Sequence, residues 1–190
     1  MVIEKSRTLK LNDCNVILGV SKLAPMSKEK SPNAPKFDAS EAGKLFFRGG
    51  HTGWLGLRYT AHGDDWVELE LPWREDLLGE SDYPVLASGP IVSLMDMASG
   101  MAIWQTMGVF RPIATLDLRV DYQRPAHERS GVWGKVECYK MTRSAAFVRG
   151  IAHDGNINDP LAHVAGVFMT IAGDPRQAKA IDERAGTGNE

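Results

Sequence analysis

One stretch decides the fold predicted for this chain: Leu86-Ala-Ser-Gly-Pro90, followed by Ile91-Val-Ser-Leu-Met-Asp-Met-Ala-Ser-Gly-Met-Ala-Ile-Trp104. The apolar residues of the second run recur at helical spacing, and no Lys or Arg interrupts them. Pro90 suits the first position of a helix, and Ser88 and Gly89 suit the cap before it. A helix that is apolar on all sides is typically buried, so the pattern predicts a helix in the core.

Asp96 is the one carboxylate in this predicted helix. A carboxylate among apolar residues loses several kcal/mol of hydration unless it is paired or protonated. Asp96 therefore either pairs with a buried Arg or accepts backbone N–H bonds, or it is an acid of a functional site, where perturbed acids gather. The pattern alone leaves both interpretations open.

The composition narrows the class of protein. The 190 residues predict one domain, with or without extensions. A net charge of −2 argues against a nucleic-acid partner, because no basic excess is present to neutralise phosphates. Cys14 and Cys138 form neither a disulfide framework nor a metal spacing, which indicates a reducing cytoplasm. No run has transmembrane or signal-peptide length, so no membrane partner is expected.

The chain divides into three predicted parts. Residues 1–36 form an N-terminal extension with a Pro-, Ser- and Lys-rich linker, and its apolar segments are expected to dock as an arm. Residues 37–173 form the domain, and 174–190 a flexible tail. A capping box at Asp38 predicts a short helix that ends at Gly49 and Gly50. His51, beside these glycines, is expected in an exposed loop without a direct catalytic role.

The remaining patterns predict an α+β domain. Residues 55–61 and 66–73 read as a hairpin, and 74–84 as a polar loop before the central helix. Four strands follow it, at 113–123, 131–139, 145–152 and 161–172, with short connections typical of a meander. In the first of them, alternation places Leu116 and Leu118 on one face and Thr115 and Asp117 on the other. A single antiparallel sheet curling around the apolar helix would bury it.

Several common functional motifs are absent from the sequence. The turn cluster from Asp154 to Asp159 lacks the glycine and glutamate of a calcium loop. The five histidines have no metal-type spacing, and no phosphate loop, dinucleotide fingerprint or nucleophile elbow occurs. We therefore expect no metal and no cofactor, and a Ser–His–Asp hydrolase has no support.

Two motifs carry a resemblance to a known family. Gly89-Pro-Ile-Val-Ser-Leu-Met-Asp-Met-Ala-Ser-Gly100 and Thr115-Leu-Asp-Leu-Arg-Val-Asp-Tyr-Gln-Arg-Pro-Ala126 resemble those of PaaI-like acyl-CoA thioesterases. The similarity spans roughly residues 45–172 in layout. It implies a hotdog fold, in which an antiparallel β-sheet wraps around one long buried helix. It also implies an acyl-CoA substrate and a homo-oligomer, a dimer or dimer of dimers, with active sites built from two chains.

The resemblance also implies roles for individual residues. Asp96 matches the family's carboxylate, which acts as general base or nucleophile against the thioester. Amides at the start of the helix polarise the carbonyl oxygen, which assigns Ser88 and Gly89 to the site, and Thr115 matches a residue that places water. Substrate and CoA binding is assigned to Arg124, Lys140, Arg143 and Gly100.

The helix motif departs from the family pattern in two ways. Its histidine falls on Ala87, and Pro90 has no N–H, so the oxyanion hole depends on the Ser88 and Gly89 amides. A lost donor of this kind costs on the order of 10²–10³ in turnover. One alternative is therefore a non-catalytic protein that binds acyl-CoA or aromatic acyl groups. A third hypothesis, an enoyl-CoA hydratase or dehydratase, lacks the histidine that such chemistry uses near this helix.

Overall fold

The computed structural model describes residues 36–80 and 82–171 of the 190-residue chain. Residues 1–35 of the predicted 1–36 extension lie outside the described residues, as does the predicted tail at 174–190. The proposed division of the chain therefore stays a prediction.

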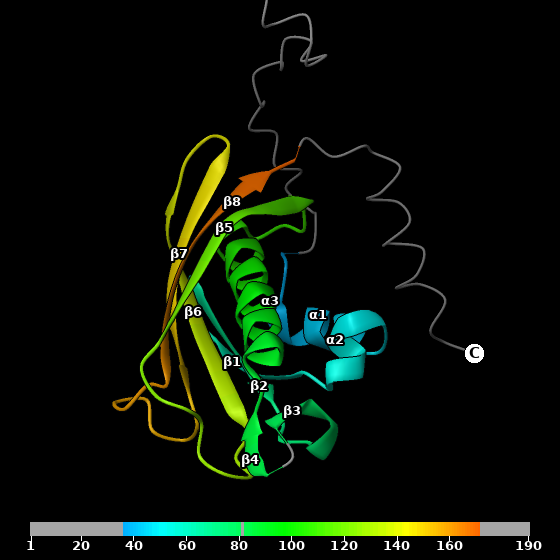
Figure 1. Cartoon of the computed structure of the whole chain (residues 1–190). Helices are drawn as coiled ribbons and strands as arrows, with labels where there is room; N and C mark the ends of the chain where they lie inside the picture. Colours follow the sequence, from blue (N-terminus) through cyan, green and yellow to red (C-terminus); the bar gives the residue numbers. More distant parts are fainter. Residues whose placement is uncertain (1–35, 81, 172–190) are drawn as a thin grey trace, which may run out of the picture. The chain divides into compact units, whose positions relative to one another are not determined.

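The described chain contains three α-helices and eight strands (Figure 1). In order they are α1 (Ala39–Phe46), α2 (Gly50–Leu55), β1 (Arg58–His62), β2 (Trp66–Leu71), a 3₁₀ turn (Glu75–Leu77), β3 (Leu78–Glu80), β4 (Tyr83–Leu86), α3 (Ser88–Met107), β5 (Ile113–Tyr122), β6 (Val132–Met141), β7 (Ala145–His153) and β8 (Ala162–Thr170).

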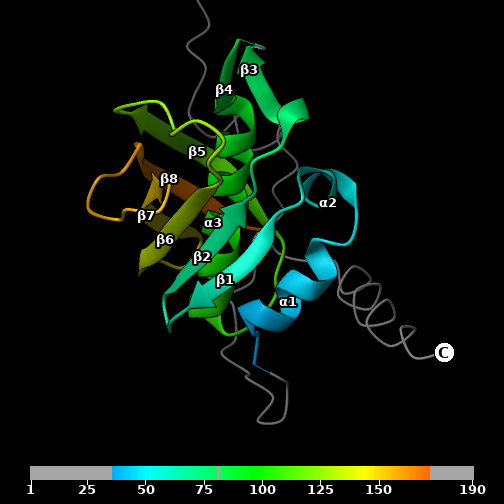
Figure 2. The same ribbon diagram turned by 90° about the horizontal axis from the view of Figure 1, so that it is seen from below.

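Six of the strands form one antiparallel sheet in the order β1-β2-β6-β7-β8-β5. The helix α3 lies along one face of this sheet, and α1 and α2 pack beside β1 and α3 (Figures 1 and 2). This is the hotdog architecture, and the predicted fold is confirmed. The predicted meander holds only for β6, β7 and β8. Because β2 already pairs with β6, the strand β5 crosses over and pairs with the far edge of β8.

The central helix begins earlier than its sequence signals predict. Ala87 is the N-cap, so Ser88 and Gly89 lie inside the helix and are not its caps. Pro90 is consequently the third helical residue, but it still lies in the first turn, where backbone N–H groups have no partner within the helix. The helix ends at Gly108, whose φ of 65° is in the left-handed region that favours glycine.

Two further segments differ from their prediction. The glycine-rich segment after α1 is not a loop, because residues 50–55 form the short helix α2, with Gly56 as its left-handed C-cap. The polar segment 74–84 forms the 3₁₀ turn and most of the small hairpin β3–β4, which ends at Leu86 and leads into the start of α3. Asp38 is the N-cap of α1, as predicted, and its carboxylate accepts the N–H groups of Ser40 at 2.8 Å and Glu41 at 3.3 Å.

Close contact between α3 and the sheet depends on Gly134 in β6. A Cβ placed there would lie 2.7 Å from the Met95 sulfur and 3.1 Å from Leu94 Cγ. Both of these side chains are fully buried. A side chain at this position would push the helix away from the sheet, because packed cores have little space into which they can relax.

We expect Gly134→Val to lower the free energy of unfolding by about 1–3 kcal/mol, because it overpacks this contact. Gly134→Ala should cost less, since the Met95 side chain is flexible. Urea denaturation measures both variants against Gly49→Ala, at a position with no atom within 4 Å of the added Cβ. Equal stability of Gly134→Val and the wild type would show that α3 does not need this close approach.

Candidate functional site

Asp96 lies near the middle of α3 and is half-buried. The Thr115 hydroxyl of β5 donates to Asp96 Oδ1 at 2.8 Å. Within residues 36–80 and 82–171, no Arg and no backbone N–H pairs with this carboxylate, so the first of the two interpretations of Asp96 does not describe it. The structure thus brings together Asp96 and Thr115, two of the predicted site residues, and leaves Oδ2 open to a ligand.

A β-bulge in β5 turns Thr115 toward Asp96. Thr115 pairs with Phe168 and Asp117 with Val167, so Leu116 is an extra residue and is 59% exposed. Residues opposite each other share a face of the sheet, and Phe168 is buried, so Thr115 faces α3. The prediction that Thr115 shares a face with Asp117, and Leu116 with Leu118, is therefore wrong. Strict alternation cannot reveal a bulge, which re-aims side chains locally.

The start of α3 offers two free backbone donors. The N–H of Ala87 is bound to the Leu77 carbonyl at 2.9 Å, and Pro90 has none, so the amides of Ser88 and Gly89 remain. Both residues are exposed. These amides lie at the positive end of a 20-residue helix and are suited to bind an oxygen that gains negative charge.

A pocket of about 350 Å³ adjoins this helix start. Its lining includes Ser88, Ile91, Tyr122, Arg124 and Leu161. The Tyr122 hydroxyl donates to the Ser88 carbonyl at 3.0 Å, which ties the end of β5 to the first residue of α3. Burial raises the pKa of the Tyr122 phenol, so the phenol stays protonated and remains a donor at neutral pH.

His51 reaches the same helix from α2, which the sequence did not predict. Its Nε2 lies 3.0 Å from Ser93 Oγ, and the Ser93 hydroxyl lies 3.3 Å from the Gly89 carbonyl. Gly89, Ser93 and Asp96 fall within about 60° of one another around the helix axis. We call these three residues the polar face of α3. No sequence pattern predicts that His51 lies beside Ser93, because this contact depends on how α2 packs against α3.

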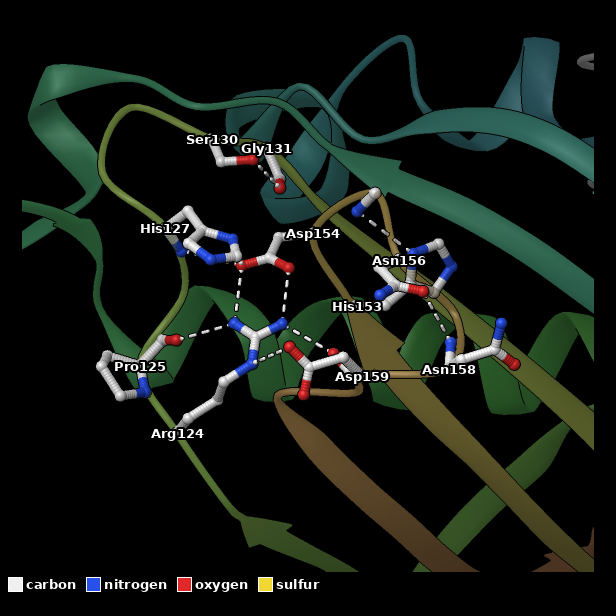
Figure 3. A network of polar contacts seen from close by, with 11 residues as sticks. Arg124, Pro125, His127, Ser130, Gly131, His153, Asp154, Asn156, Asn158 and Asp159 are labelled. Carbon is white, nitrogen blue, oxygen red and sulfur yellow. Dashed lines mark hydrogen bonds and ion pairs between the residues drawn. The ribbon is translucent and has the colours of Figure 1, made fainter.

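Arg124 belongs to a network beyond the end of β5 (Figure 3). Its guanidinium makes two hydrogen bonds to the Asp154 carboxylate, at 2.7 and 2.8 Å, and a further one to the backbone carbonyl of Asp159 at 2.6 Å, whose carboxylate lies 3.2 Å from Arg124 Nε. The Asp154 side chain is fully buried and also accepts the backbone N–H of His127 at 2.7 Å. The Arg124 guanidinium holds the pKa of the Asp154 carboxyl well below its usual range. The network therefore ties the end of β5 to the turn between β7 and β8.

The other predicted binding residues lie apart from the helix start. Lys140, near the end of β6, and Arg143, in the turn that follows, are both exposed. This turn is at the end of the sheet opposite the β3–β4 hairpin (Figure 1). Gly100 is buried in α3 one turn beyond Asp96, and a Cβ there would lie 3.5 Å from Ile113. The assignment of Arg124, Lys140, Arg143 and Gly100 to CoA stays a prediction.

No group of three or more His, Cys, Asp or Glu side chains between residues 36 and 171, Ser81 aside, is arranged to hold a metal ion. In the same part of the chain, no helix is both long enough and apolar enough to span a membrane.

Comparisons with known proteins complete the description of the site. The thioesterase superfamily model matches residues 83–160, which include α3 and β5. A solved protein of Pseudomonas aeruginosa is 33% identical, with a TM-score of 0.62 over 70% of this chain and 96% of that chain. A thioesterase of Haemophilus influenzae is 18% identical, with a TM-score of 0.62 over 71% of this chain and 91% of that one.

A variant of the phenylacetic acid degradation protein PaaI of Thermus thermophilus is also similar. It is 22% identical, with a TM-score of 0.54 over 63% of this chain and 96% of that chain. The likenesses to the Haemophilus and Thermus proteins, both below 25% identity, bear on the fold alone. Among curated proteins, none matches the chain.

We expect Asp154→Asn to lower the free energy of unfolding by about 3–5 kcal/mol at pH 7, because it removes the buried carboxylate that pairs with Arg124 and leaves only the exposed Asp159 beside that charge. The native pKa of Asp154 is lowered, so its stabilisation is present above the unfolded pKa of about 3.9 and is lost as pH falls below it. Urea denaturation from pH 7 to pH 3 should show the difference between the two proteins begin to narrow below about pH 4, because the loss is complete only when pH falls through the lowered native pKa.

Asp76→Asn is the matched control, because Asp76 is also paired with an arginine, Arg74, but is exposed. It should change stability little, since exposed ion pairs contribute little. A difference between wild type and Asp154→Asn that stays constant down to pH 3 would contradict the assigned pKa direction.

Proposed function

The chain belongs to the thioesterase superfamily, and we propose that it is a cytoplasmic acyl-CoA thioesterase in which Asp96 acts as general base. The observation that carries this proposal is the Thr115–Asp96 hydrogen bond, which fixes a half-buried carboxylate on the polar face of α3. With Oδ1 held by Thr115, Oδ2 is free to accept a proton from water as the water attacks the thioester carbonyl.

The start of α3 supports the second part of this chemistry. A thioester whose carbonyl oxygen meets the Ser88 and Gly89 amides would gain stabilisation as the oxygen becomes an oxyanion. Collapse of the tetrahedral intermediate breaks the carbon–sulfur bond, and the proton that Asp96 accepted from water passes to the leaving sulfur, which releases the free acid and the CoA thiol. The adjoining pocket is of a size that fits part of a small ligand.

The predicted oligomer gives the outer edge of β5 a partner. This ten-residue strand pairs with β8 on one side only, and the exposed Leu116 lies on it. A sheet edge of this length is a template for pairing with another chain. We propose that two copies pair through β5, which places the Asp96 and Thr115 of each copy beside the seam.

The CoA phosphates would then be bound by exposed basic residues. The donors of Arg124 already face Asp154 and Asp159, which favours a structural role for this residue. Lys140 and Arg143 are exposed basic side chains, of the kind that bind phosphates. Their distance from the start of α3 is compatible with CoA contacts that come from the second copy.

We expect Asp96→Asn to abolish free-thiol release from a panel of benzoyl-CoA, butyryl-CoA and octanoyl-CoA, because the substitution keeps the shape and removes the base. Thr115→Val should lower kcat less, since it only releases the carboxylate. Asp64→Asn, in the exposed turn after β1, is the control and should match the wild type. A wild type that binds these acyl-CoAs without releasing thiol would instead be the acyl-binding protein of the alternative hypothesis.

We expect Leu116→Arg to shift the protein toward the monomer in size-exclusion chromatography with light scattering, because it places a charge at the proposed seam. Ile157→Arg is the matched control, as Ile157 is also an exposed apolar residue but lies in the β7–β8 turn. If both variants keep the oligomeric state of the wild type, then β5 is not the contact between copies.

A further inference from the structure

The helix α2 holds His51 against α3 by several contacts. The Thr52 hydroxyl donates to the Phe46 carbonyl at 2.8 Å, and Arg74 donates to the Trp54 carbonyl. The His51 ring is stacked on the Trp54 indole, with the planes 24° apart. These contacts hold α2 in place and orient the imidazole, whose Nε2 lies 3.0 Å from Ser93 Oγ.

Ser93 lies between the other two members of the polar face. It is one turn beyond Gly89 and one turn before Asp96, and side chains three or four residues apart on a helix are neighbours, with Cβ atoms about 5–6 Å apart. A thioester carbonyl attacked by water at Asp96 is therefore within reach of the Ser93 hydroxyl. In the absence of substrate this hydroxyl lies 3.3 Å from the Gly89 carbonyl, a long and weak hydrogen bond.

The start of α3 offers few hydrogen-bond donors to an oxyanion, and Ser93 together with His51 would add one. Among the first residues of α3, only Ser88 and Gly89 offer free amides, because Pro90 has no N–H and the Ala87 N–H is bound to Leu77. Ala87 also has no side-chain donor. The Ser93 hydroxyl lies on the same side of α3 as Asp96, and the His51 imidazole reaches it from α2. Thr115 reaches Asp96 from β5.

We propose that Ser93 is a further oxyanion donor and that His51 is its positioning residue. The inference rests on the proposed thioesterase function. When substrate binds, the Ser93 hydroxyl turns from the Gly89 carbonyl to the thioester oxygen, and the Nε2–H of His51 donates to Ser93 Oγ. A donor that is itself hydrogen-bonded is polarised and donates more strongly. No proton is transferred in this step, and no covalent bond forms between Ser93 and the acyl group.

The test measures kcat and KM for the acyl-CoA of the panel that the wild type hydrolyses fastest. We expect Ser93→Ala to lower kcat on the order of 10²-fold with little change in KM, because the bond is made only in the transition state. His51→Ala should lower kcat roughly tenfold, because it acts through Ser93. Ser93→Thr and His51→Gln, which keep a hydroxyl and an N–H donor, should restore part of the loss.

The double variant of Ser93→Ala and His51→Ala tests whether the effect of His51 on kcat passes through Ser93. Because His51 acts through Ser93, the double variant should be no slower than Ser93→Ala alone. Ser99→Ala is the matched control, since Ser99 makes the same kind of bond to the carbonyl four residues earlier, at 2.7 Å to Met95, on the buried side of α3. Thermal unfolding of every variant shows whether the fold is kept.

The outcomes distinguish this inference from the function on which it rests. If Asp96→Asn abolishes thiol release and folded Ser93→Ala keeps the kcat of the wild type, the thioesterase proposal stands and the donor role of Ser93 is overturned. Additive losses in the double variant would overturn the positioning role of His51. Absence of thiol release from the wild type on the whole panel overturns both proposals.

Discussion

The packing of an almost wholly apolar helix against the sheet is the constraint on which this structure depends. Leu94 and Met95 meet β6 at Gly134, where only a hydrogen on Cα leaves room for them. A helix of this kind loses stability wherever water reaches it, so the sheet must curl around it. The side of α3 that is left open carries Gly89, Ser93 and Asp96, with the exposed Val92 beside them. The polar residues of α3 are therefore concentrated where a ligand would approach it. The same helix supplies the centre of the core and the residues of the proposed site.

Local periodicity was sufficient to predict α3, the strands after it and an antiparallel sheet around the helix, and the resemblance of two motifs to a known family implied the hotdog fold. The run from Ile91 to Trp104 and the alternation in the later strands are strong signals, and Gly108 ends the helix as expected. The position of β5 in the sheet was not predictable in this way. Pairing with β8 depends on which sheet edge β2 leaves free, and that is a property of the complete topology.

The site was predicted only in part, because much of it depends on contacts that local sequence patterns do not reveal. Asp96 was identifiable as a charge within an apolar run, and Thr115 only through a resemblance. Three features had no local signal: the bulge at Leu116, the approach of His51 to Ser93 and the pairing of Arg124 with Asp154. Each of them joins segments that are far apart in the chain. His51 in particular was assigned to a loop, because its glycine neighbours do not indicate the helix that tertiary packing stabilises.

The end of β5 connects the Arg124–Asp154 network to the start of α3. Arg124 is held by Asp154, and Tyr122, two residues earlier, donates to the carbonyl of Ser88 at the start of α3. Tyr122 and Thr115 are both on β5, so one strand contacts α3 at its first residue and at Asp96. Loss of the Arg124–Asp154 pair would loosen the far end of this strand. The Ser88 and Gly89 amides would then lose part of their fixed position relative to Asp96, and a donor stabilises an oxyanion only where its position is fixed in advance.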